Sequence, residues 1–170
     1  METADDVLLE SLRHFYDSPK HSAAVHAILH KPGEKVSLRI LDWLLTNYSK
    51  KHNVSYILPA EDRMFNMYID YKSQLRSYSK RRFDVFKRRN RIHFPLADGT
   101  MLESTVAQLN LFRWALRNGV MDYCVEHLKD IERDMNKSME RKTVGKRKQL
   151  SRAAIQTCTK TPIRVRVSFD

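Results

Sequence analysis

One segment of the sequence, TVAQLNLFRWALRNG at residues 105–119, is apolar on nearly every side of the helix that it predicts. Thr105 and Gln108 have the spacing of a capping box at its start, and Asn118-Gly119 is a typical helix stop. A helix without a polar face is unstable at the surface, because its apolar side chains would remain in contact with water. We therefore expect a central helix with the rest of the chain packed around it.

Apolar residues at intervals close to 3.6 predict further helices on both sides of this segment. Residues 1–30 form a helical pair, with Val7, Leu8, Leu12 and Phe15 on one face of its first helix and a break at Ser18-Pro19. Ser37 is the expected N-cap of a helix that ends at residues 50–51, and residues 71–82 could form a further, basic helix. A last helix is predicted from residue 120 to about 135.

Two other segments have the shorter period of β-strands. VSYIL (54–58) and MFNMYI (64–69) flank the turn PAEDR and predict a hairpin. RIHFPLADGTML (91–102) carries Asp98-Gly99 between two extended runs and predicts a second hairpin, in which Pro95 would suit an edge strand. The expected fold class is α+β: mainly helical, with about five helices and short β-hairpins, plus a basic C-terminal arm.

The same patterns predict three regions along the chain. Residues 1–34 would be the N-terminal helical pair, residues 35–136 an α+β core domain, and residues 137–170 the basic arm. Within the arm, residues 163–169 alternate apolar with polar side chains, which favours a short docking strand.

Chain length and composition exclude several classes of protein. A chain of 170 residues that is 42% hydrophobic can build a core without metal or disulfide staples. It has no uninterrupted run of eighteen apolar residues, and its acidic start lacks the pattern of a signal peptide, so we expect no transmembrane segment and no secretion. Two cysteines, Cys124 and Cys158, are too few for a disulfide framework and favour free thiols in a reducing compartment.

Positive charge is concentrated in two stretches. The formal net charge is +11, and residues 61–100 hold ten basic against five acidic groups while residues 136–170 hold ten against two. Clustered lysine and arginine favour a polyanionic ligand, because their contact with it releases condensed counterions. Nucleic acid is the first candidate; an anionic membrane surface, an acidic protein partner or a solvated basic face would fit the same charge.

The densest cluster lies between residues 72 and 91, where nine of twenty residues are Lys or Arg and Asp84 is the only acid. A helix there would place Lys72, Arg76 and Lys80 on one ridge, over about 12 Å. Tyr78, Phe83 and Phe86 lie among these cations and could stack on bases if they are exposed; the alternative is that they belong to the core. The predicted phosphate-binding residues are Lys72, Arg76, Lys80, Arg81, Arg82, Lys87, Arg88, Arg89 and Arg91, extended in the arm by Lys142, Lys146, Arg147, Lys148 and Arg152.

Metal binding and catalysis are weakly indicated. His26 and His30, and Cys124 and His127, have spacings that could place two ligands on one helix face, but Cys124 falls in an apolar stripe and no C-x-x-C or H-E-x-x-H motif is present. We expect no metal and no cofactor. Phosphate-binding glycine loops and the nucleophile elbow are absent, and the E-x-K spacing of Glu140 and Lys142 lies in the arm, so a non-enzymatic protein is expected over a nuclease.

Three blocks carry a family resemblance: SLRILDWLLTNYSKKHNVSY, YIDYKSQLRSYSKRRFDVFKRR and TVAQLNLFRWALRNGVMDYCVEHLKDIERDM. Over residues 37–135 they resemble a small, uncharacterised protein family of nucleocytoplasmic large DNA viruses, of the iridovirus, marseillevirus and algal-virus kind. The phrase DYKSQLRSYSKRRFD is the most specific part. The acidic first helix and the basic arm look specific to this chain.

The resemblance implies a setting: a viral factory in the cytoplasm or nucleus of an infected cell, or the virion. Our first hypothesis is a non-enzymatic, sequence-tolerant protein that binds nucleic acid, with duplex DNA favoured, in genome organisation, packaging or transcription. The alternative is a minor capsid or other virion structural protein whose basic arm binds acidic viral proteins.

Overall fold

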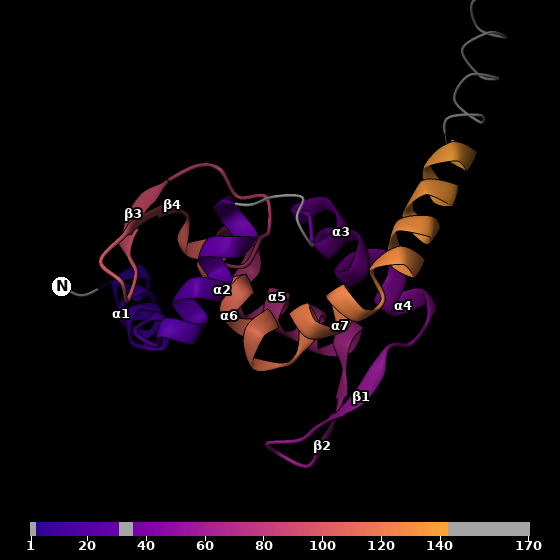
Figure 1. Cartoon of the computed structure of the whole chain (residues 1–170), viewed down its shortest axis with the longest axis horizontal. Coiled ribbons are helices and arrows are strands. Elements are labelled where there is room, and N and C mark those ends of the chain that lie inside the picture. Colours follow the sequence, from indigo (N-terminus) through magenta and orange to yellow (C-terminus); the bar gives the residue numbers. More distant parts are fainter. Residues whose placement is uncertain (1–2, 31–35, 143–170) are drawn as a thin grey trace, which may run out of the picture. The chain divides into compact units, whose positions relative to one another are not determined.

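Helix α6 (Val106–Arg117) is the central element, as its apolar sequence predicts. It packs against α1, α2, α5 and α7 (Figure 1). Residues 109–115 are all buried. The Thr105 hydroxyl accepts a hydrogen bond from the Gln108 amide at 3.2 Å and so begins the helix. Gly119 takes the left-handed conformation, with φ +65°, that ends it.

The computed structural model describes residues 3–30 and 36–142, and the chain divides into two units, residues 1–132 and 133–170. The described part confirms the α+β class and the two β-hairpins. It contains seven labelled α-helices, α1 to α7, and residues 128–142 are helical as well, so the expected number of about five was too low. The predicted boundaries at residues 34 and 136 stay predictions, and residues 143–170 of the expected arm lie outside the described residues, the predicted strand over 163–169 included.

Helices α1 (Ala4–Tyr16) and α2 (Pro19–His30) form the predicted pair and contact both each other and α6. The buried face of α1 consists of Leu8, Leu12 and Tyr16, whose hydroxyl donates to the Leu109 carbonyl at 2.8 Å. Val7, predicted on this face, is exposed, because the contact with α6 turns the helix toward Tyr16.

The helix predicted from Ser37 to residue 51 is correct in extent but not in its winding. It consists of α3 (Leu38–Trp43), a π-helical turn η1 (Leu44–Tyr48) and α4 (Ser49–Lys51), and Ser37 is its N-cap. Within it the hydroxyls of Thr46 and Ser49 donate to the carbonyls of Asp42 and Leu45, four residues earlier. Such side-chain bonds compete with the main-chain ladder, which explains the local rewinding.

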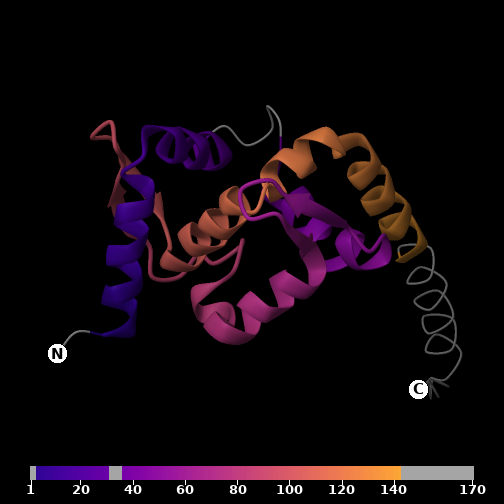
Figure 2. The same ribbon diagram turned by 90° about the horizontal axis from the view of Figure 1, so that it is seen from below.

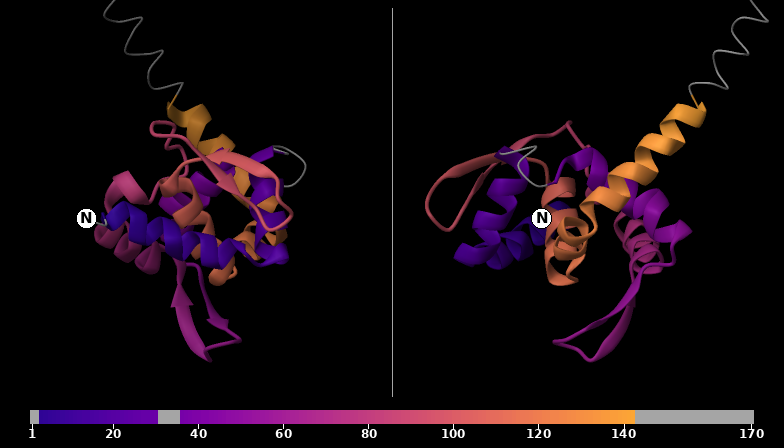
Figure 3. Two further views of the ribbon diagram at one scale, coloured as in Figure 1. Left: turned by 90° about the vertical axis from the view of Figure 1, so that its left-hand side faces the viewer. Right: turned by 45° about the vertical axis from the view of Figure 1, so that its right-hand side comes forward.

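The first hairpin joins β1 (Ser55–Leu58) to β2 (Arg63–Asn66) in antiparallel register, and Figure 3 shows it projecting from the helices. The predicted second strand continued to residue 69, but it ends at Asn66. The Asn66 side-chain oxygen accepts a hydrogen bond from the Ile69 amide at 3.0 Å and caps helix α5 (Met67–Arg82). Consequently Met67 is buried at the start of a helix, while Ile69 is 67% exposed.

The second hairpin joins β3 (Ile92–Pro95) to β4 (Met101–Ser104) and is anchored on the N-terminal pair (Figure 2). The Ala97 amide donates to the buried Ser22 hydroxyl of α2 at 3.0 Å, and the Phe94 ring lies edge-on to Tyr16 of α1. Gly99 has φ +82° in the connecting turn, as the Asp98-Gly99 pair predicts.

The last predicted helix is interrupted. Helix α7 (Val120–Glu126) ends at His127, whose φ and ψ of −104° and 18° are not helical, and helix resumes over residues 128–142. Cys124 and Ile131 are buried on the predicted stripe and Leu128 is half-buried. Of the second unit, residues 133–142 are described, and they are helical beyond the predicted end at residue 135.

Candidate nucleic-acid interface

The predicted cations on α5 lie on two sides of a break in the helix. Lys72 and Arg76 are exposed on its continuous part, about 6 Å apart along the axis at 1.5 Å per residue. Ser79 has φ +56° and ψ 168°, a conformation that non-glycine residues rarely adopt, and it interrupts the helix. Lys80 follows this break, so the predicted straight ridge of three cations was wrong.

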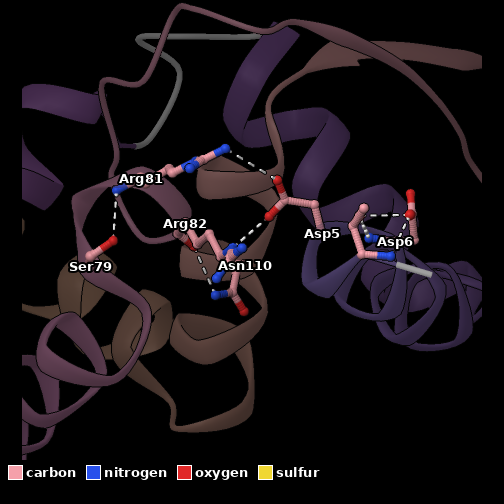
Figure 4. A network of polar contacts seen from close by, with 7 residues as sticks. Asp5, Asp6, Ser79, Arg81, Arg82 and Asn110 are labelled. Atoms are coloured by element: carbon pink, nitrogen blue, oxygen red, sulfur yellow. Dashed lines mark hydrogen bonds and ion pairs between the residues drawn. The ribbon is translucent and has the colours of Figure 1, made fainter. Parts of the chain in front are cut away.

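Arg81 and Arg82 face an acid on α1 (Figure 4). Arg82 Nε lies 2.5 Å from Asp5 Oδ1, and a guanidinium nitrogen of Arg81 lies 3.9 Å from Asp5 Oδ2. The Arg82 carbonyl accepts a hydrogen bond from Asn110 of α6 at 2.9 Å, which holds this turn against the core. Asp5 therefore neutralises part of the positive charge that the sequence assigned to a phosphate surface.

Arg91 is neutralised in the same way. Its guanidinium lies 2.9 Å from Glu103 on β4, and the hydrogen bond from Arg91 lowers the pKa of the Glu103 carboxyl. Both side chains are about half exposed, so water and salt screen the pair. Lys72, Arg76, Lys80, Lys87, Arg88 and Arg89 remain, and within the described residues none of them has a carboxylate inside 4 Å.

Lys80 and Asp84 both act on the carboxyl group of Asp42. Asp42 lies half-buried on α3; burial and the nearby Asp84 carboxylate raise its pKa, while Lys80 lowers it. Lys80 is therefore partly compensated at longer range. The least compensated cations of this region are Lys72, Arg76, Lys87, Arg88 and Arg89.

Residues 84–91, which we name the basic loop, are fastened at their first half to the N-terminal end of α6. The Gln108 side chain donates to the Val85 carbonyl at 2.8 Å, and the Thr105 hydroxyl contacts the Lys87 carbonyl at 3.3 Å. Gln108 therefore has two roles. Its side chain holds the loop, and its main-chain amide donates to the Thr105 hydroxyl that caps the helix. Val85 is buried, so the backbone is fixed while Arg88 and Arg89 are exposed.

The three aromatic residues of the cluster have different environments. Phe83 is 1% exposed and packs against Tyr71 and Trp114, so of the two alternatives it belongs to the core. Tyr78 is half-buried and stacks on Phe83. Phe86 is 41% exposed and remains available to a ligand.

The arm residues of the prediction are mostly outside the described part. Lys142 is exposed on the helix of the second unit. Lys146, Arg147, Lys148 and Arg152 lie beyond the described residues, and their predicted role stays a prediction.

The candidate metal ligands do not come together. The His26 and His30 rings are 4.7 Å apart on α2, but Cys124 is buried, where burial raises the pKa of its thiol to about 12, and His127 stacks on Tyr123. Over residues 3–30 and 36–142, no group of three or more His, Cys, Asp or Glu side chains is placed to hold a metal ion.

An apolar groove of about 860 Å³ lies between α2, α6, α7 and the β3–β4 turn. Ala23, Ala27, Leu116 and Met121 are among its lining residues. None of the predicted phosphate-binding residues lines it, so the groove and the basic loop are separate features.

Sequence reasoning missed the residues that modulate and support this surface. Asp5 is 77 positions away from Arg82, and no local pattern reports such a contact. Gln108 was assigned to the cap alone, although a polar side chain on an otherwise apolar helix is a signal for a buried hydrogen bond.

Within the described residues no helix is both long and apolar enough to cross a membrane.

The comparisons with known proteins place the chain among viral relatives. It is 38% identical over 113 residues to "Uncharacterized protein L507" of Acanthamoeba polyphaga mimivirus, a large DNA virus. The match covers 62% of this chain and 44% of that relative, so the chain spans less than half of the relative's length. No solved structure matches the chain.

These findings confirm the resemblance to a protein of large DNA viruses; the iridovirus, marseillevirus or algal-virus kind stays a prediction. A family model described as "Family of unknown function (DUF7197)" matches residues 2–170. The match includes the acidic first helix and the basic arm, so the expectation that both are specific to this chain was wrong. The chain therefore belongs to the DUF7197 family.

Proposed function

We propose that this protein binds nucleic acid through its phosphates, without reading base sequence and without catalysing a reaction. The observation that carries the proposal is the basic loop, whose backbone is hydrogen-bonded to Thr105 and Gln108 while Arg88 and Arg89 stay exposed. Cations on a fixed backbone lose less conformational entropy when they contact an anion than cations on a free segment. Phosphate contacts of this kind fix position but carry no sequence information.

The helix beneath the loop adds to the positive potential. Thr105 is the N-cap of α6 and Gln108 lies in its first turn, the end at which the main-chain amide groups give a helix its partial positive charge. Lys72 and Arg76 on the continuous part of α5 are further exposed cations. Asp5 and Glu103 oppose this potential at Arg81, Arg82 and Arg91, so we assign those three a smaller share of binding.

The viral relative supports a setting for this activity. A large DNA virus must organise, transcribe and package its genome in the infected cell, and a sequence-tolerant phosphate-binding protein suits each of these tasks. We propose DNA as the ligand on that basis, with the C-terminal arm adding contacts.

The test is fluorescence anisotropy with the purified full chain and labelled random-sequence duplexes and single strands at about 50 and 200 mM salt. Six to ten phosphate contacts predict a loss of affinity of roughly a thousandfold or more across that range. If the protein binds none of the probes at the lower salt, the proposal is refuted. An acidic protein partner would then be the explanation for the clustered positive charge.

A further inference from the structure

The basic loop displays an aromatic ring as well as charge. Among the Phe, Tyr and Trp side chains of residues 3–30 and 36–142, Phe86 is the only exposed one; all others are buried or half-buried. Phe83, three positions earlier, is 1% exposed, whereas Phe86 is 41% exposed. The fold thus buries one phenylalanine of this segment and leaves the other in water.

The backbone around Phe86 is fixed on both sides. Its amide donates to the Asp84 carboxylate at 2.9 Å, the preceding carbonyl of Val85 accepts from Gln108, and the following carbonyl of Lys87 contacts the Thr105 hydroxyl. The Asp84 carboxylate is engaged with the loop's own backbone. These bonds hold the main chain that carries the Phe86 ring next to the three consecutive cations Lys87, Arg88 and Arg89.

An exposed aromatic ring beside fixed cations is the arrangement that binds unpaired nucleotides: the ring stacks on a base while the cations contact the adjoining phosphates. In a duplex both faces of each base are already stacked on neighbours, and opening a step costs a few kcal/mol. The two ligands therefore differ in whether Phe86 can contribute to binding.

We infer that Phe86 is a base-stacking platform that directs this surface to unpaired single strands, in place of the duplex that the sequence predicts. The inference rests on the proposed function, since the cations supply the phosphate contacts on which stacking depends. The inference goes beyond the proposed function by naming single-stranded nucleic acid as the ligand and Phe86 as the side chain that selects it.

The experiment compares labelled oligo(dT) of about 20 nucleotides with a random-sequence duplex of about 20 base pairs, lengths that exceed one typical binding site. The full chain is expected to bind oligo(dT) more tightly than duplex. Phe86→Ala should weaken oligo(dT) binding by about 5- to 150-fold, the range for loss of one stacked base, and leave duplex binding within about threefold. Phe86→Trp should retain oligo(dT) binding and add an indole emission that the oligonucleotide quenches.

Two control variants separate stacking from charge and from loss of a surface side chain. Arg88→Ala with Arg89→Ala should weaken both probes, because both present phosphates. Ile57→Ala removes a similarly exposed apolar side chain from β1, with no lysine or arginine within two positions, and should change neither. Phe86 is on the surface, so its variants should keep the wild-type circular dichroism and melting temperature.

Each failure has its own meaning. Binding of the unmodified chain to both probes, with equal or no loss in Phe86→Ala, would overturn the platform and leave the phosphate surface intact. A preference for duplex would overturn it as well. Binding to neither probe at low salt would overturn the proposed function itself.

Discussion

Replacing Lys87, Arg88 and Arg89 with Ala removes three consecutive cations of the basic loop, of which Lys87 is half-buried and Arg88 and Arg89 are exposed. The Lys87 carbonyl accepts a hydrogen bond from Thr105, the N-cap of α6, and no carboxylate of the described residues lies within 4 Å of any of the three side chains. The variant should bind all sequences more weakly and lose part of the salt dependence of binding.

The magnitude follows from the number of phosphates that the protein neutralises, each of which releases condensed counterions. Each neutralised phosphate contributes about 0.9 to the slope of log K against log salt in duplex DNA and about 0.7 in single strands. Three lost contacts therefore predict a slope that is flatter by about 2.7 units with duplex and about 2.1 units with oligo(dT). Arg81, Arg82 and Arg91 do not enter the count because the variant leaves them unchanged, and Asp5 and Glu103 offset part of their charge.

A matched control variant has the same net charge as the Lys87, Arg88 and Arg89 variant. Arg13→Ala, Lys20→Ala and Lys129→Ala together also reduce the formal charge from +11 to +8 (11 − 3), but from exposed positions outside the cluster. Anisotropy titrations at several salt concentrations should show a slope change below about one unit for this control. Equal slopes for the two triple variants would refute the reasoning, because binding would then follow total charge and not the basic loop.

Three further predictions concern the fold. Burial and Asp84 raise the pKa of Asp42, so its ionised form destabilises the native state above that pKa. Asp42→Asn should therefore raise the free energy of unfolding in urea at pH 7, and this gain should shrink as the pH falls toward 4. A gain in the free energy of unfolding that is independent of pH would contradict this cause. Burial raises the pKa of Cys124 to about 12, so in a Cys158→Ser background its thiol should react with a thiol reagent at pH 8 only after unfolding; rapid reaction of the native protein would show that Cys124 is accessible. Ser79→Gly should raise the free energy of unfolding by about 1 kcal/mol, because the relieved backbone strain, of order 1–3 kcal/mol, exceeds the cost of the larger conformational entropy that glycine has in the unfolded chain. A less stable variant would count against strain at the break.

Local sequence patterns were sufficient for the elements whose causes are local. The caps at Thr105 and Ser37, the stop at Asn118-Gly119 and the turn at Asp98-Gly99 depend on hydrogen bonds and backbone freedom within four residues, and the structure has each of them. The central position of α6 followed equally directly, because an apolar helix must be enclosed.

Where two local tendencies compete, packing decided between them. The alternation around Phe65, Met67 and Ile69 is compatible with a strand, but the Asn66 side chain caps a helix there and places Met67 in the core. The broken ridge on α5 has the same origin, since Ser79 takes a conformation that only the surrounding structure can impose.

The sequence alone determined that the cations of residues 72–91 lie among aromatic residues, because composition is local information. Only the tertiary structure decided which of them face a ligand. Asp5 reaches Arg82 across 77 residues, and Phe83 enters the core while Phe86 stays in water, although the two side chains are chemically identical. The outcome depends on long-range packing against α1 and α6, which buries apolar area at one position and leaves the other outside.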